Sequence, residues 1–516
     1  IGLCRHGPGG GGAETDGTGP MTTRREFLAR GAACGLLGAT GLPVVRARDT
    51  EPIVQLHPGI EPLVRLVERT PRQKCVGMFA DQVRKGVPYR ELLASLFLAG
   101  IRNVNPQPPG FKFHCVFVIN AAHQVSLDLP ADQRLLPLFW ALDNFKASQQ
   151  KDVQEGDFRL GPVRGRLPSP ETAWDEFDRA MTDWDEQRAD RAIVALVRSA
   201  GAHQIIESLW RYGARDYRNI GHKAIFVANT WQTLQTIGWQ HAEASLRSLV
   251  LGLLDFGKSE RVNKYAFADQ TFLANELFVN KLWPAGSDRT FPANWSPQWS
   301  QPGSQPGQVD ELLALLRRDA PLACCRHVRD GLGQGRFRAQ AAWDAVHLLA
   351  GELMMRQPGI YGIHTVTSAN ALHTAFELAA RPANRLLMLL QAVGWMVQFR
   401  EFMSGARNGL NGANIFKVAS TRVPGDHHRA IAAVLADVGK NAPAAAAQAR
   451  GLAERAAETG HSGWLEDFAS TARQQLVRKA GDAHDYKYAM AIFADLHRVS
   501  PLYRPQMLST AAYYLK

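Results

Sequence analysis

Residues 358–375 read PGIYGIHTVTSANALHTA, and residues 109–125 read PGFKFHCVFVINAAHQV. Both stretches follow one pattern, in which Pro-Gly and three or four further residues precede His-x-Val-x3-Asn-Ala-x-His. In both, the apolar residues after Pro-Gly have helical spacing and do not keep the alternation of a β-strand. The pattern predicts two helices related by duplication, although a chance match between two alanine-rich helices remains the alternative.

Helical spacing of apolar residues extends over most of the chain. Ser169-Pro170-Glu171 has the residue types of a helix start, and we expect one long amphipathic helix from there to about Arg198. Further helices are expected, each bounded by Gly or Pro, at 203–214, 221–237, 239–256, 340–356, 363–380, 382–404, 428–438, 443–459, 463–480 and 484–498. The sequence therefore predicts an all-α, multi-helical array of two related halves, without significant β-sheet.

A segment rich in Pro, Gly and Trp interrupts the helical pattern near the middle of the chain. It covers residues 284–309 and is too long for an ordinary connection between helices. We therefore expect an N-terminal helical half at 48–283 and a C-terminal helical half at 310–516. The segment itself is interpreted as a linker or a functional loop.

The N-terminal region has the features of a leader. Residues 21–47 resemble a twin-arginine (Tat) export signal, with Arg24-Arg25, a weakly apolar stretch and a small-residue cleavage site at Ala47. We expect cleavage after Ala47, the Tat translocase as partner during export, and a periplasmic or extracellular mature protein. Residues 1–20 carry no hydrophobic pattern and are interpreted as an upstream-translation artefact.

Composition and motif searches exclude several classes of partner and cofactor. The chain has 516 residues and a net charge of +11, but no basic run with interleaved aromatic residues, so we expect no nucleic-acid partner. No later apolar run reaches the length of a transmembrane anchor. A c-type haem is excluded because no CxxCH motif occurs. Residues 252–259, GLLDFGKS, fit a phosphate-binding loop but follow a predicted helix and not a strand, so we expect no nucleotide.

The histidines of the repeated pattern are the strongest candidates for chemistry. His114 and His123 are nine residues apart, as are His364 and His373, and this spacing places each pair on opposite faces of one helix. We therefore expect one histidine of each pair to face inward, with His114 and His364 favoured because they follow the Pro-Gly turns. Asn120 and Asn370 each share a face with the second histidine.

A further series, His203, His222 and His241, recurs close behind predicted helix starts. Histidines that converge from several helices make either a metal centre or an acid/base site. The candidate catalytic residues are His114, His203 and His364, and the candidate binding residues are His222, Asn120, Asn370, His123 and His373. If a metal is present, its expected ligands are His114, His203, His222 and His364; the alternative is that these are ordinary packing histidines.

Three short stretches carry a resemblance to a known family. Residues 363–372, IHTVTSANAL, and residues 202–210, AHQIIESLW, resemble histidine-bearing helices of the questin oxidase-like family. Residues 113–116, FHCV, are similar to its first histidine helix, with Phe113 where that family has Asn. The resemblance implies an all-helical protein and oxidative ring opening of aromatic polyketides with a reduced nicotinamide cofactor. The export signal argues against that soluble cofactor.

Two hypotheses of function follow from these observations. The first is an exported oxidoreductase or oxygenase that acts on an aromatic or apolar small molecule through inward-facing histidines. The second is a non-catalytic helical scaffold or binding protein of the periplasm, which recognises a protein partner or a glycan through the Trp-rich loop. The second hypothesis requires exposed aromatic side chains at Trp283, Trp295 and Trp299.

Overall fold

A computed structural model describes residues 53–256, 266–284, 292, 295–405 and 409–516. The expected export signal at 21–47 and the preceding residues lie outside the described residues. Residues 285–291 and 293–294 of the predicted loop also lie outside the described residues.

Helices form the regular structure of these ranges, which contain no β-strand, and the all-α prediction is thereby confirmed. Up to the loop the α-helices are α2 (Glu61–Arg69), α3 (Arg72–Arg84), α4 (Tyr89–Asn103), α5 (His114–Leu127), α6 (Leu136–Glu155), α7 (Ala173–Thr182), α8 (Glu186–Ser199), α9 (Ala202–Gly213), α10 (His222–Ile237), α11 (Ala242–Leu253) and α13 (Ala266–Leu282). From residue 306 onward they are α14 (Pro306–Arg318), α15 (Pro321–Gly333), α16 (Ala339–Arg356), α17 (Ile360–Leu378), α18 (Pro382–Ser404), α19 (His427–Asp437), α20 (Ala442–Thr459), α21 (Trp464–Lys479), α22 (Ala483–Arg498) and α23 (Arg504–Ala511).

One predicted helix is wrong. The single helix expected between Ser169 and Arg198 is two helices, α7 and α8, separated by a turn. Trp184 adopts a left-handed φ of 58°, which ends α7, and the Asp185 carboxylate caps α8 by accepting from the backbone N–H of Arg188. Trp184 is held there because its ring lies 3.5 Å from the Arg215 guanidinium.

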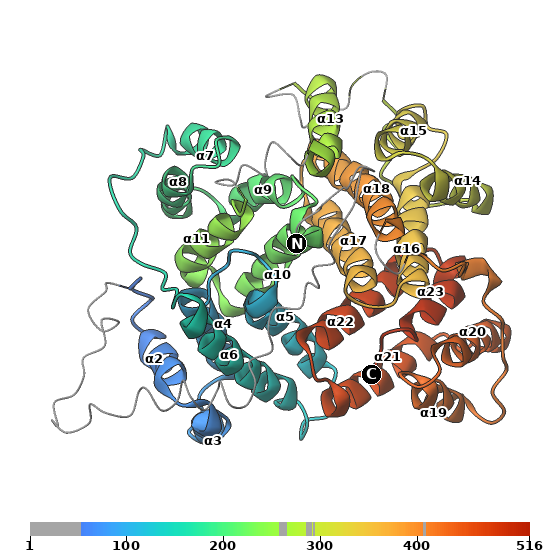
Figure 1. Ribbon diagram of the computed structural model, residues 1–516, viewed down its shortest axis with the longest axis horizontal. Helices are drawn as coiled ribbons and strands as arrows, with labels where there is room; N and C mark the ends of the chain where they lie inside the picture. The colour runs from blue at the N-terminus through green and yellow to red at the C-terminus, as the bar shows by residue number, and fades with distance from the viewer. Residues whose placement is uncertain (1–52, 257–265, 285–291, 293–294, 406–408) are drawn as a thin grey trace, which may run out of the picture. The chain divides into compact units, whose positions relative to one another are not determined.

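Four helices form the centre of the described body, and we call them the central helices: α5, α10, α17 and α22 (Figure 1). Helix α5 packs against α10 and α22, and α17 packs against the same two helices, so the four close into a ring. Two of them come from the predicted N-terminal half and two from the C-terminal half. Helices α4 and α6 cover α5 from outside, while α16 and α18 cover α17.

The turns that begin α5 and α17 share one backbone conformation. Gly110 has φ 117° and ψ −161°, and Gly359 has φ 131° and ψ −160°, which are angles that only glycine adopts readily. The two Pro-Gly turns that form a repeat in the sequence therefore also adopt the same backbone conformation. Each turns the chain into a central helix just before a histidine.

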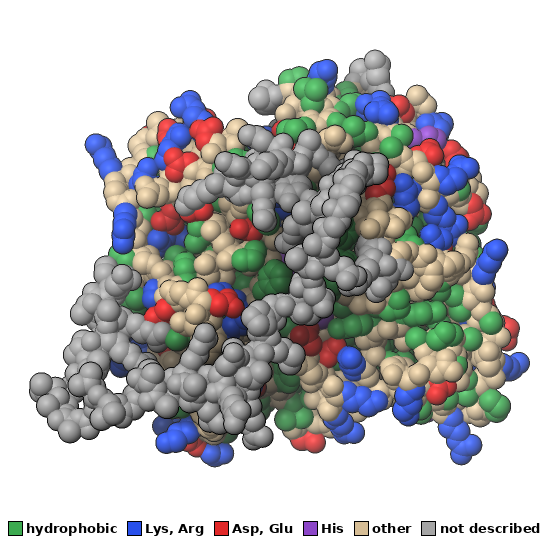
Figure 2. Space-filling model, viewed as in Figure 1, with side chains coloured by type: hydrophobic (Ala, Val, Ile, Leu, Met, Phe, Trp, Pro, Cys, Tyr) green, Lys and Arg blue, Asp and Glu red, His purple; other side chains and the backbone are tan. Residues whose placement is uncertain are grey.

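The surface seen in Figure 2 carries basic and acidic side chains interspersed with one another. Among the described residues, none of the helices has both the length and the apolar character needed to span a membrane. Trp283, Trp295 and Trp299 are buried and pack against one another, with ring centroids about 6 Å apart. The exposed aromatic surface required for a binding role is not found at these three residues.

Candidate metal centre

Four histidines, one from each central helix, meet inside the ring of helices. We call them the histidine cluster: His114, His222, His364 and His484. One ring nitrogen of each lies within 4.8 Å of the corresponding nitrogen of the other three. Each histidine is in the first or second turn of its helix, so the cluster forms where the four helices begin.

The backbone before His222 is strained, and the strain orients this side chain. Asn219 and Ile220 have left-handed φ values of 58° and 50°, and Gly221 follows with 84°. A β-branched residue such as Ile220 rarely adopts this conformation, which costs about 1–3 kcal/mol and is typical of functional sites. The turn brings the Asn219 carbonyl 2.5 Å from Nδ1 of His222.

Neighbouring groups fix the tautomers of three of the imidazoles. Nδ1 of His222 faces the Asn219 carbonyl, Nδ1 of His364 lies 2.6 Å from the Ile360 carbonyl, and Nδ1 of His484 lies 2.5 Å from an Asp482 carboxylate oxygen. Carbonyl and carboxylate oxygens only accept hydrogen bonds, so each of these Nδ1 atoms carries the proton. In the neutral ring, Nε2 then presents a lone pair.

Two of these lone pairs point at one another: Nε2 of His222 lies 2.9 Å from Nε2 of His364. Nε2 of His114, whose tautomer is not among the three fixed above, lies 2.8 Å from Nε2 of His222. No hydrogen bond joins the lone pairs of neutral His222 and His364, and a cation placed between them would remove their repulsion. Nε2 of His484 is buried and has no hydrogen-bond partner in the described part of the chain. Such outer hydrogen bonds on Nδ1 with Nε2 directed inward are the arrangement of metal-binding histidines.

The surroundings keep the imidazoles neutral, as metal ligation requires. Burial lowers the pKa of each histidine in the cluster below its ordinary value, and the nearby Lys487 adds to this effect. Lys487 is itself buried on α22, and this burial lowers its pKa to about 7. Its ammonium group lies 5.2 Å from the Phe117 ring, which in turn contacts the rings of His114 and His222.

A cavity of about 150 Å³ lies between the central helices, and its lining begins about one helical turn after the cluster histidines, at Ile225, Thr367 and Lys487. We call it the amide cavity because its polar lining consists mainly of side-chain amides. These include Asn120, Gln124, Asn229, Gln232 and Asn370, joined by Lys487 and Arg498.

Three of the four metal ligands expected from the sequence belong to the cluster, and His203 does not. His203 is exposed at the start of α9, where its ring packs against Trp231 with centroids 5.2 Å apart. The structure does not bring it to the site because α9 packs on the outer side of α10 and its first turn faces solvent. His241, the third member of that series, lies beside His57 and also outside the cluster.

The other predicted binding residues divide between the cavity and the protein core. Asn120 and Asn370 both line the amide cavity. His123 lies outside the cluster, with Nδ1 3.1 Å from the Tyr89 hydroxyl. His373 also lies outside it, with Nδ1 2.7 Å from Nε2 of His347.

Sequence reasoning missed His484 and Lys487. Helix α22 was expected at 484–498, and the N-cap Asp482 two residues before His484 was the available signal. Asp482 accepts from the His484 backbone N–H while its carboxylate also holds Nδ1 of the ring. The hydrogen bond from the ring lowers the pKa of Asp482 to about 2. Asp482 thus both caps the helix and orients the His484 ring.

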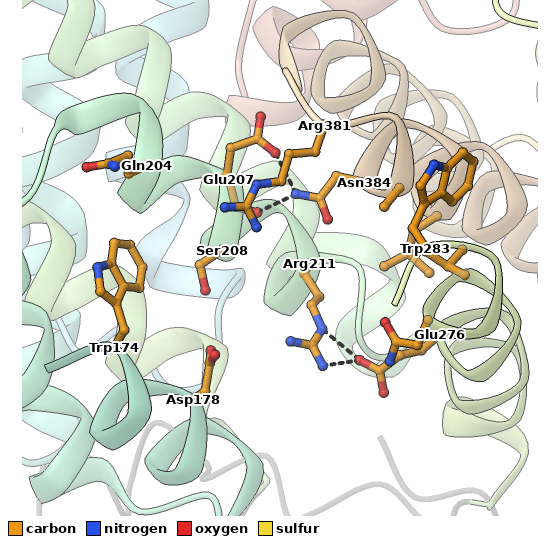
Figure 3. Close-up of a pocket in the computed structure, with 14 residues that line it drawn as sticks. Trp174, Asp178, Gln204, Glu207, Ser208, Arg211, Glu276, Trp283, Arg381 and Asn384 are labelled. Atoms are coloured by element: carbon orange, nitrogen blue, oxygen red, sulfur yellow. Dashed lines mark hydrogen bonds and ion pairs between the residues drawn. The ribbon is translucent and has the colours of Figure 1, made fainter. Parts of the chain in front are cut away.

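A wider cavity of about 910 Å³ lies between α9, α13 and the start of α18, away from the histidines (Figure 3). Its charged groups are already paired: Arg211 with Glu276, and Glu207 with the side-chain amide of Asn384. A group of His427, His461 and Asp467 lies nearer the surface, with Nε2 of His461 3.0 Å from the Asp467 carboxylate. Neither place combines burial, fixed tautomers and unpaired nitrogen atoms as the cluster does.

Comparisons of this chain with protein-family models, with curated proteins and with solved structures found no match.

Proposed function

We propose that the protein is a metal-dependent oxidoreductase whose transition-metal ion is bound by His114, His222, His364 and His484. The single observation that carries the proposal is the set of Nε2 lone pairs directed at one another by acceptors fixed on Nδ1. A packing histidine satisfies its nitrogens with donors and acceptors, whereas the Nε2 atoms of His222 and His364 face each other as two acceptors.

The ligand set favours certain metals. Four imidazoles without a carboxylate or thiolate suit iron, copper, nickel or zinc, and they do not suit the hard cations calcium and magnesium. Iron and copper would supply redox and oxygen chemistry when bound, in keeping with the oxidoreductase expected from the sequence. Neutral ligands leave the positive charge of such an ion uncompensated, so it would attract an anionic group.

The protein's own residues would bind and shield the substrate. Substrate would approach through the amide cavity, where Asn120, Asn229 and Asn370 orient it by hydrogen bonds. Phe117 would help to exclude water from the cluster, because it packs between Lys487 and the rings of His114 and His222. At about 150 Å³ the amide cavity does not fit a nicotinamide dinucleotide, so no step of the proposal involves that cofactor.

We also propose that the protein is exported by the Tat pathway. Arg24-Arg25 and the cleavage site at Ala47 support Tat-dependent transport to the periplasm or beyond. Replacing both arginines with lysine should leave the protein in the cytoplasm, as measured by cell fractionation. Unchanged export of that variant would contradict this part of the proposal.

Metal analysis of the purified protein tests the centre directly. We expect about one equivalent of a transition metal in the wild type by elemental mass spectrometry, and less than about a tenth of that in H222A, because His222 touches two other ligands. H203A is the matched control and should keep the wild-type metal content, since His203 lies outside the cluster. Metal-free wild-type protein that also fails to bind added Fe²⁺, Cu²⁺ or Zn²⁺ would refute the proposal.

A further inference from the structure

We propose that the amide cavity is the substrate channel of the metal centre and that it selects small organic anions of about ten non-hydrogen atoms. This inference rests on the proposed function and adds the substrate class and its route.

The cavity lies directly beyond the cluster along all four central helices. The residue seven positions after each cluster histidine lines it: Ala121, Asn229, Ala371 and Ala491. Seven residues make about two helical turns, so each of these residues shares a face with its histidine at roughly 10 Å along the helix. Lys487 lines the cavity only one turn after His484 and marks its inner end.

The lining becomes more exposed with distance from the cluster. Lys487, Ala371 and Ala491 are buried, whereas Gln124 and Arg498, further along their helices, are partly exposed. The amide cavity therefore leads from the outer ends of the central helices toward the histidines. A small molecule that enters there reaches Lys487 before the metal centre.

The charge of the lining favours anions. Two cationic residues and no acidic residue line the cavity. The Arg498 guanidinium is compensated by Glu377 and Asp495, but Lys487 forms no ion pair within the described part of the chain. Burial without a partner favours the neutral amine, and a bound carboxylate or phenolate would supply the acceptor that stabilises the ammonium form. The metal ion beyond it would add to the positive potential.

The volume limits the size of the ligand. A cavity of about 150 Å³ accommodates a molecule of roughly the size of benzene with a small polar group. The side-chain amides around it supply donors and acceptors for that polar group, and Ile225 and Met490 supply apolar contacts. A polycyclic substrate would not fit without displacing the helices.

Benzoate and benzamide form a matched pair of probes, because they have the same size and differ in charge. We expect the wild type to bind benzoate at least tenfold more tightly than benzamide in calorimetric titrations, and K487M to lose most of this preference. K151M, which removes an exposed lysine elsewhere, should keep it. Equal binding of the two probes by the wild type would overturn the proposed selectivity for anions.

A second variant tests the location. A371L fills the cavity with a larger side chain, and we expect it to abolish binding of both probes while its metal content and far-UV circular dichroism stay at wild-type values. Undiminished benzoate binding by A371L would place the anion elsewhere and overturn the channel. Titrations of both metal-loaded and chelator-treated wild type separate the two proposals, because a chain that never binds metal refutes the proposed function whether or not benzoate binds.

Discussion

His373 lies flat against the Trp343 ring, with centroids 4.0 Å apart and an angle of 5° between the rings. Burial and the neighbouring His347 lower its pKa well below the ordinary value of 6.5. The folded protein therefore favours the neutral form of the His373 ring. Its position outside the histidine cluster allows its titration to be studied separately from metal binding.

The lowered pKa of His373 predicts a loss of stability in acid. Because the folded pKa is below the unfolded one, unfolding takes up a proton as the pH falls below about 6.5, so this contribution to stability is present above that value and is lost below it. Chelator-treated wild type should lose more unfolding free energy between pH 7.5 and 5.5 than chelator-treated H373Q. Guanidinium denaturation at both values checks this, and identical pH dependence in the two proteins would contradict it.

Asp482 has two roles that substitution can separate. Its carboxylate caps α22 and also holds Nδ1 of His484. Asparagine caps a helix nearly as well as aspartate, but it is uncharged and holds the imidazole less strongly. D482N should therefore keep its unfolding free energy within about 0.5 kcal/mol while its metal affinity falls about 10- to 100-fold, as for other outer-shell ligand partners.

Competition with a metal-sensitive dye measures that affinity, and chemical denaturation of the metal-free protein measures the stability. D482A serves as the comparison, since it should lose about 1 kcal/mol of stability in addition to the metal affinity. Wild-type metal affinity in D482N would mean that Asp482 acts only as a helix cap.

At the scale of elements, the two Pro-Gly turns provide a matched pair of glycines. A Cβ on Gly110 would lie 3.0 Å from the His222 ring, whereas a Cβ on Gly359 would meet nothing within 4 Å. Both positions have a φ that disfavours any other residue. The turns share a conformation, but of the two glycines only Gly110 packs closely against a histidine of the cluster.

Alanine substitution should therefore have different effects at the two turns. G110A and G359A should each lose about 1–3 kcal/mol of stability from backbone strain. Only G110A should also lose metal, because its new methyl group displaces the His222 ring. Thermal denaturation and elemental analysis of both variants check this expectation, and equal metal loss in the two would show that strain, and not the contact with His222, governs the site.

At the scale of the whole molecule, the proposed metal centre joins distant parts of the chain. Helices α5 and α10 precede the 284–309 loop, α17 and α22 follow it, and each contributes one histidine to the cluster. A bound metal therefore stabilises the packing of all four central helices. Ligand binding to the folded state alone adds about 2.7 kcal/mol when the free metal is 100 times its dissociation constant.

Chelation should lower the melting temperature of the wild type, and added metal should restore it. In H222A the chelator should have no effect, because the site is already lost. Differential scanning calorimetry measures both proteins under the same conditions. A chelator-induced shift of equal size in H222A would indicate that the stabilising metal is bound elsewhere.

The local sequence pattern was sufficient to predict most of the helices, but it did not predict every histidine of the cluster. Most of the helices predicted after residue 200 begin and end within a few residues of those observed, because apolar periodicity and Gly or Pro boundaries are local properties. The turn at Trp184 was missed because a side-chain contact with Arg215, distant in sequence, stabilises it. His203 and His484 occupy similar places at helix starts, so local pattern could not distinguish them.

The sequence by itself determined the all-α class and the repeated Pro-Gly turns before His114 and His364, because both follow from residue types and spacing that are local in the chain. Only the tertiary structure decided that α22 packs between α5 and α17, that His484 replaces His203 beside His222, and that Lys487 marks the inner end of a cavity. The physical reason is that a binding site needs side chains from several helices at one point, and the packing of helices distant in sequence sets that arrangement.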